Sequence, residues 1–183
     1  MSSTDHAENH ADNLARAAQV RLMIFDVDGV LTDGSLHYGA DGEALKTFNV
    51  HDGLGIKLLQ EAGVQTAIIS ARVSPQVIKR AADLGIGFLH QGGHDKLTPF
   101  HALLEKTGLT AEQAGFIGDD VVDLPILSRV GFAVSVPNGR AEVHARAHHI
   151  TEAAGGRGAV REICEFILRA QGRYDQVMAQ FLV

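Results

Sequence analysis

The sequence predicts an α/β protein with a Rossmann-like parallel sheet and helices on both of its faces. Short apolar runs alternate with segments of helical periodicity, which is typical of parallel strands joined by crossover helices. Polar residues collect where the apolar runs end, and ligands in such sheets bind outside the carboxyl ends of the strands. With 183 residues, the chain is long enough for one domain with a substantial buried core.

The individual strands are predicted by apolar runs bounded by polar residues and glycines. They are expected at residues 22–27, 66–70, 87–90, 114–118, 132–136 and 148–151. Capping residues and glycines predict the ends of the helices, with Asp52 and Ser74 as two of the expected N-caps. The helices are expected at residues 52–63, 74–85, 96–108 and 158–172, with a capping-box turn at 110–113.

Two segments fall outside this alternation. Residues 35–48 predict a β-hairpin with its turn at residues 39–42, directly after the first strand, where a crossover helix is expected. The N-terminus is polar, with at most two helical turns between Ala11 and Ala18. The expected organisation is therefore a polar tail (1–20) and one domain (21–183), which ends in a C-terminal helix and tail (156–183).

The composition excludes several classes of protein. A hydrophobic content of 45% and a charged content of 21% fit a soluble globular protein, and no stretch approaches the roughly 20 apolar residues of a membrane span. The single cysteine, Cys164, excludes an internal disulfide and suits a reducing cytoplasm. The net charge of −6 argues against a nucleic-acid partner but is compatible with a small anionic substrate.

Two aspartates stand at the end of the first apolar run, in the stretch FDVDG. Asp26 and Asp28 would point to the same side of a continued strand, and two carboxylates aimed at one point need a cation, a shared proton, or both. Mg²⁺ is the natural candidate because it prefers oxygen ligands and binds few protein carboxylates. The alternative is a turn with two solvated aspartates.

A second acidic cluster follows the apolar run at 114–118, in the stretch GDDVVD. Asp120 can cap the following short helix, which accounts for only one of its three acids. Capping does not explain the other two acids, Asp119 and Asp123. Two acidic clusters at adjacent strand ends would make a divalent-cation site.

Two further positions suit an anionic oxygen. Ser70 ends an apolar run, Arg72 follows it, and a helix begins just beyond. Lys96 stands at the start of a predicted helix, where its charge opposes the helix dipole. Taken singly, a capping serine with a surface arginine and a solvated lysine are equally ordinary explanations.

The four motifs together, in this order and fold context, resemble the haloacid dehalogenase superfamily of phosphotransferases over residues 21–151. The resemblance implies that Asp26 is the nucleophile, forming an aspartyl phosphate, and that Asp28 acts as acid and then as base. It implies that Ser70 and Lys96 bind the phosphoryl oxygens. The implied Mg²⁺ ligands are Asp26, the backbone carbonyl of Asp28, and Asp119, with Asp120 and Asp123 supporting them.

The intervals between these motifs are too short for a cap domain, so an uncapped site is expected. The stretches FDVDGVLTDG, FNVHDGLGIK, GDDVVDLPIL and AGGRGAVREICEFILRAQG, together with the hairpin, extend over nearly the whole chain after residue 21. They resemble the 3-deoxy-D-manno-octulosonate (KDO) 8-phosphate phosphatases. That family implies a cytoplasmic homotetramer, assembled through its hairpins, which acts on a sugar-acid phosphate in lipopolysaccharide precursor synthesis. The substrate-contacting residues implied by the family are Asp28, Asn49, Val50, His51, Asp52, Gly53, Lys57, Arg72, Arg80 and Lys96, with Arg157 reaching a neighbouring subunit or remaining solvated.

Several alternatives stay open. The family usually has arginine where His51 and Lys57 stand, so a related substrate, such as a nine-carbon sialic-acid-type 9-phosphate, is the nearest competitor. A phosphatase fold retired to an assembly or regulatory role is a second, although every catalytic residue is retained. A signalling receiver domain is disfavoured because its acidic pair comes first, whereas here D-x-D comes first and the acidic pair late.

Overall fold

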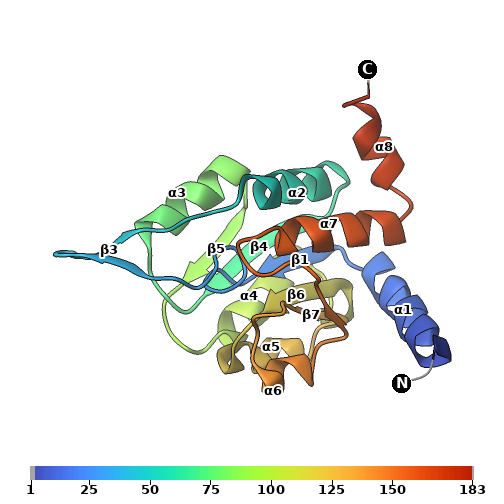
Figure 1. The fold of residues 1–183 in the computed structure, drawn as a ribbon, viewed down its shortest axis with the longest axis horizontal. Helices are drawn as coiled ribbons and strands as arrows, with labels where there is room; N and C mark the ends of the chain where they lie inside the picture. Colours follow the sequence, from blue (N-terminus) through green and yellow to red (C-terminus); the bar gives the residue numbers. More distant parts are fainter. Residues whose placement is uncertain (1–2, 183) are drawn as a thin grey trace.

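The computed structural model describes residues 3–182 and contains a six-stranded parallel sheet (Figure 1). The strand order is β5-β4-β1-β6-β7-β8, which places the first strand near the centre. All six predicted strands are present, with ends that differ by a few residues, and the predicted fold class is confirmed. The strands are β1 (Leu22–Phe25), β4 (Gln65–Ser70), β5 (Phe88–Gln91), β6 (Ala114–Gly118), β7 (Phe132–Ser135) and β8 (His149–Ile150).

Helices cover both faces of the sheet, because each strand presents alternate side chains to opposite sides. In β1, Met23 and Phe25 join the core beneath α2 (Val50–Glu61), α3 (Pro75–Leu84) and α7 (Ala159–Ala170). Leu22 and Ile24 belong to the other core, together with residues of α4 and α5. Figure 1 shows these two helices on the opposite side of the sheet from α2 and α7. The helices and 3-10 turns from residue 97 to the last strand are α4 (Leu97–Thr107), η1 (Ala111–Gln113), η2 (Val121–Asp123), α5 (Leu124–Leu127) and α6 (Ala141–His144).

The predicted hairpin is also present, as β2 (His37–Gly39) and β3 (Gly42–Leu45). It forms a separate antiparallel pair and projects away from the sheet, as the blue extension in Figure 1 shows. Its two strands are joined by the turn that the glycines predict.

The N-terminal segment differs from the expected polar tail. Residues Ser3–Ala18 form one helix, α1, which lies against α7 (Figure 1). Asn13 and Ala17 of this helix are buried, and Arg16 pairs with Asp12 at 2.8 Å one turn earlier. The buried residues Asn13 and Ala17 are polar or small, so the sequence carries no strong apolar signal for this contact face.

The predicted N-caps of the helices were partly wrong. Asn49, not Asp52, caps α2: its side chain accepts a hydrogen bond from the His51 amide, and Asp52 lies inside the first turn. Ser74 occupies the N-cap of α3 but makes no capping bond to the backbone there. The C-terminal tail contains an additional short helix, α8 (Tyr174–Ala179). Within residues 3–182, no helix combines the length and apolar character needed to cross a membrane.

Candidate active site

The four predicted motifs meet at the carboxyl edge of the sheet. Asp26 follows β1, Ser70 ends β4 and Asp119 follows β6, and these three strands are neighbours. Lys96 reaches the same place from the N-cap position of α4. The fold therefore brings these side chains together because parallel strands that neighbour one another end at the same edge.

The acidic cluster can hold a cation. Carboxylate oxygens of Asp26, Asp119 and Asp123 lie within 4.8 Å of one another. Burial and the repulsion of Asp123 raise the pKa of Asp26 to about 8, although Lys96 partly offsets them. Burial and the repulsion of Asp123 and Asp120 raise the pKa of Asp119 to about 7. The buried Oδ1 of Asp119 has no hydrogen-bond partner, so the residues present fit a divalent cation.

Lys96 is the counter-charge of this cluster, and its side chain is only 1% exposed. Its Nζ lies 2.8 Å from Asp26 Oδ1 and 2.6 Å from Asp123 Oδ1. Burial alone lowers the pKa of Lys96, but the attraction of Asp26 and Asp123 outweighs it, and the net pKa is raised. The lysine therefore stays charged beside the nucleophile candidate, where a transferring phosphoryl group would add negative charge.

Asp123 and Asp120 are engaged by the backbone. Asp123 Oδ2 accepts the amides of Asp119 and Asp120 at 3.0 and 3.2 Å. Asp120 is exposed and caps η2 through the Val121 amide, as its position in the sequence predicts. These contacts shape the loop that presents Asp119, which is the arrangement expected of supporting residues.

In the loop after Asp28, the backbone of Gly29 passes close to the side chain of Asp119. Gly29 has φ +91°, and a Cβ at this position would lie 2.1 Å from Asp119 Oδ2, so only glycine fits. The carbonyl of Gly29 accepts a hydrogen bond from Asn138 Nδ2, and Asn138 Oδ1 accepts the Gly155 amide, both at 2.8 Å. Asn138 thereby clamps two loops together, a role that its place in a Pro-Asn-Gly turn did not reveal.

These side chains surround a cavity of about 280 Å³. It is lined by Asp26, Asp28, Ser70, Ala71, Arg72, His94, Lys96, Asp119, Asp120 and Val122. His94, which lies outside the four motifs, is among them. Glu43 and Lys46 approach Asp28 and Arg72 from the hairpin side. Neither was predicted, and their only signal was an acid and a base three residues apart on the hairpin.

The other predicted substrate-contacting residues do not line this cavity. Arg80 Nη2 donates to the Asn49 carbonyl at 3.2 Å and lies where a Cβ on Gly53 would be, so these three form one group at the start of α2. Three further members of the set, Val50, His51 and Lys57, are exposed on the surface of α2. Their contact with substrate stays a prediction.

Asp52 and Arg157 have contacts of another kind. Asp52 is 1% exposed and accepts the Arg161 amide at 2.8 Å, so it ties α2 to the start of α7. Burial raises the pKa of Asp52, although backbone amides of α7 partly offset it. Arg157 is exposed and pairs with Asp33 at 3.2 Å.

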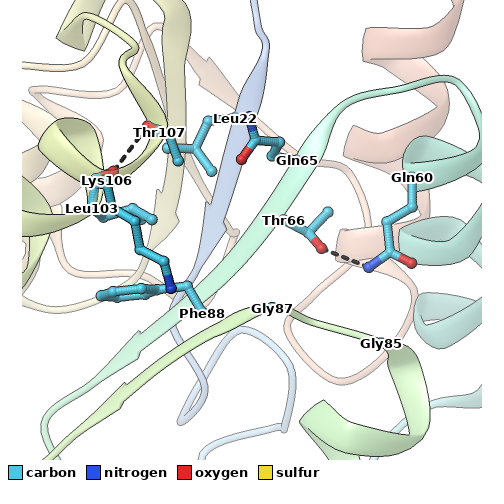
Figure 2. Close-up of a pocket in the computed structure, with 10 residues that line it drawn as sticks. All are labelled: Leu22, Gln60, Gln65, Thr66, Gly85, Gly87, Phe88, Leu103, Lys106 and Thr107. Carbon is cyan, nitrogen blue, oxygen red and sulfur yellow. Dashed lines mark hydrogen bonds between the residues drawn. The ribbon is translucent and has the colours of Figure 1, made fainter.

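A larger cavity, of about 450 Å³, lies at the opposite edge of the sheet (Figure 2). Its lining includes Leu22 and Gln65, the first residues of β1 and β4. Gln60 donates to Thr66 at 2.6 Å, and Lys106 lies over the ring of Phe88. No carboxylate, histidine or cysteine is among its lining residues in the described chain, so this cavity does not present the acidic cluster that the other one has.

Comparisons with known proteins agree with the geometry. Residues 84–163 match a family model for haloacid dehalogenase-like hydrolases. The chain is 45% identical over 170 residues to the 3-deoxy-D-manno-octulosonate 8-phosphate phosphatase KdsC of Escherichia coli (strain K12), covering 93% of this chain and 90% of that one.

Two solved structures are similar throughout. The phosphatase of the same name from Moraxella catarrhalis, in complex with magnesium, phosphate and KDO, matches with a TM-score of 0.90 and 43% identity, over 92% of this chain and 97% of that one. The cobalt-bound deoxy-D-mannose-octulosonate 8-phosphate phosphatase from Haemophilus influenzae matches with a TM-score of 0.87 and 45% identity, over 92% and 99%.

Proposed function

The chain belongs to the 3-deoxy-D-manno-octulosonate 8-phosphate phosphatases of the haloacid dehalogenase-like hydrolases, and we propose that it hydrolyses that sugar-acid phosphate to KDO and phosphate. The observation that carries the proposal is 45% identity over 170 residues, a span that includes every motif of the candidate site. The enzyme is a phosphoric monoester hydrolase with Mg²⁺ as its cofactor. We place its reaction in lipopolysaccharide precursor synthesis, in the cytoplasm.

The proposed mechanism uses the two D-x-D aspartates in sequence. An Asp26 oxygen attacks phosphorus, the bond from phosphorus to the sugar oxygen breaks, and Asp28 gives its proton to that oxygen. A water oxygen then attacks phosphorus, Asp28 takes the proton of that water, and the bond from phosphorus to the Asp26 oxygen breaks, which releases phosphate and restores the Asp26 carboxylate. Lys96 and Ser70 bind the phosphoryl oxygens, which fits the 2.8 Å contact between Lys96 and Asp26.

Mg²⁺, held by Asp26, the Asp28 carbonyl and Asp119, supplies positive charge to the phosphoryl group and to the carboxylates. Asp120 and Asp123 hold the loop of Asp119, as their backbone contacts support. Arg72, at the edge of the cavity, is proposed to bind the sugar acid, because a guanidinium pairs with carboxylate or phosphate.

The proposed assembly is a homotetramer built through the hairpin. Leu36, Tyr38 and Leu45 are 44–66% exposed on or beside it, an apolar set that another subunit can cover. The same assembly would bring a neighbour's Arg157 and C-terminal tail toward the substrate, and the group at the start of α2 would contact the sugar from one side.

The decisive experiment is phosphate release from a panel of sugar-acid phosphates in the presence of Mg²⁺. KDO 8-phosphate is expected to give the highest kcat/KM, and a nine-carbon sialic-acid-type 9-phosphate is the competing substrate. A clear preference for the nine-carbon compound would make that compound the proposed substrate. Absence of turnover on every compound would support the retired, regulatory alternative.

Asp26→Asn tests the nucleophile in the same assay. The variant keeps the shape of the side chain but removes the attacking charge, so turnover should fall by about 10⁴-fold or more while circular dichroism stays unchanged. Asp12→Asn on the exposed face of α1 is the matched control and should retain full activity. Near-normal turnover by Asp26→Asn would refute the assignment.

A further inference from the structure

Lys46, directly after β3 at the base of the hairpin, carries a buried ammonium group that the sequence motifs do not account for. Its side chain is 1% exposed, and its Nζ forms ion pairs with Asp28 and, at 2.7 Å, with Glu43 Oε1. A buried charge that loses its partner is strongly unfavourable. Lys46 is therefore confined between these two carboxylates.

Each of the two D-x-D aspartates forms an ion pair with a different buried lysine. Lys96 contacts Asp26 at 2.8 Å, whereas Lys46 contacts Asp28. Among the ion pairs of residues 3–182, none joins Lys96 to Asp28 or Lys46 to Asp26. Each carboxylate of the motif thus has its own cation, and the two cations come from different parts of the fold.

The pair of Lys46 and Asp28 leaves one carboxylate oxygen accessible. Lys46 binds Asp28 Oδ1, whereas Oδ2 faces Arg72 Nε at 3.6 Å, which is beyond hydrogen-bond distance. Glu43 lies next to both Lys46 and Arg72: its Oε1 pairs with Lys46 Nζ, and its Oε2 lies 3.6 Å from Arg72 Nη2. The carboxylate of Asp28 is fixed in orientation by one oxygen while the other can meet a ligand.

We propose that Lys46 is the positioning residue of Asp28, with Glu43 holding Lys46 in place. This inference rests on the proposed function, in which Asp28 gives its proton to the sugar oxygen as the bond from phosphorus to that oxygen breaks. A displacement of about 1 Å in a reacting group costs roughly 10²-fold in rate, so a misplaced Asp28 slows the steps in which it moves a proton. The hairpin consequently contributes to the chemical step as well as to assembly.

The test compares Lys46→Met and Lys46→Arg on two phosphate monoesters that the wild type turns over. One has an alkyl alcohol leaving group, which needs a proton, and the other has an acidic nitrophenol, which leaves without one. Lys46→Met is expected to lower kcat for the alkyl ester by about 30-fold or more, with KM changed by less than about 3-fold. The first phosphoryl transfer from the nitrophenyl ester, read as the pre-steady-state burst of nitrophenol, should lose less than about 3-fold, because Asp28 moves no proton in that step. Lys46→Arg should recover part of the alkyl activity.

Two further variants complete the design. Lys79→Met removes an exposed lysine that pairs with Asp83 on α3, and it should leave both substrates unaffected. Glu43→Gln should show the selectivity of Lys46→Met in weaker form, and it remains informative if Lys46→Met fails to fold. Equal losses in the alkyl turnover and in the nitrophenol burst, or no loss in either, would overturn the proposal.

The failure of this inference is distinguishable from failure of the proposed function. If Asp26→Asn abolishes turnover while Lys46→Met retains normal kcat on the alkyl ester, only the role of Lys46 is wrong. If Asp26→Asn keeps its activity, the proposed mechanism itself fails, whatever the Lys46 variants do.

Discussion

Asp26 and Asp119 are buried carboxylates whose charged forms are costly without a cation. Burial and repulsion raise their pKa values to about 8 and about 7, well above the 3.8 expected for an unfolded chain. Because the folded state binds these protons more tightly, the metal-free protein loses stability as pH rises from about 4 to 8. A divalent cation must displace the same protons, so binding and protonation compete.

The apparent affinity for Mg²⁺ should therefore rise as pH increases from 6 to 8.5. Isothermal titration calorimetry at several pH values measures it, and proton release can be read from buffers of different ionisation enthalpy. Asp26→Asn should flatten the dependence by removing one of the competing groups. An affinity that stays constant between pH 6 and 8.5 would contradict the raised pKa values.

Gly29 offers a second prediction at this scale. Gly29→Ala introduces a Cβ that meets Asp119 Oδ2 at 2.1 Å, so Asp119 must move and turnover should fall by about 10²-fold. Gly42→Ala is the matched control: its φ is +112°, but no atom lies within 4 Å of the added carbon. Both variants should lose about 1 kcal/mol of stability through backbone strain, which thermal unfolding measures. Only Gly29→Ala should also lose activity and Mg²⁺ affinity. Equal activities would show that Asp119 tolerates displacement.

Among the elements, α1 tests how far the buried face of a polar helix stabilises the domain. Ala17 is fully buried where α1 meets the domain, whereas Ala15 is exposed on the same helix. Ala17→Asp buries a charge without a partner, so it should lower the free energy of unfolding by about 3 kcal/mol or detach the helix. Ala15→Asp should stay within about 0.5 kcal/mol, and both should keep their turnover number. Chemical denaturation measures the difference, and identical midpoints would show that α1 contributes nothing.

The strands and most helix ends could be predicted because their signals are local. Gly85 and Gly108, for example, end α3 and α4 in the left-handed conformation that favours glycine. Asp52 was misassigned as a cap because its partner amide, that of Arg161, lies 109 positions away. No local pattern distinguishes an aspartate that caps its own helix from one that caps a distant helix.

The same distinction applies to the candidate site. Asp26, Ser70 and Asp119 could be predicted because a parallel sheet brings the ends of neighbouring strands together. Lys46 and Asn138 could not, since their contacts depend on how the hairpin and a turn after β7 fold back over the sheet. The core of the site follows from topology, whereas the residues that orient it follow from tertiary packing.

For the whole molecule, the main prediction concerns assembly. Sedimentation should give a mass near four times the 19.5 kDa of one chain. Leu36→Asp should dissociate the assembly, because Leu36 is 44% exposed at the start of the hairpin and a charge there would be buried in the interface. Ile150→Asp, with 41% exposure on the edge strand β8, should not. A fully active monomer would show that the open site needs no neighbouring subunit.

The clamp formed by Asn138 has a consequence for synthesis of the chain. The loop of Gly29 is fastened by residues that leave the ribosome more than a hundred positions later, at 138 and 155. A nascent or truncated chain that ends after Asp123 contains all four motifs but lacks Asn138 and Gly155, the two residues that clamp the Gly29 loop beside Asp119. The activity is therefore expected to appear only once translation has passed residue 155.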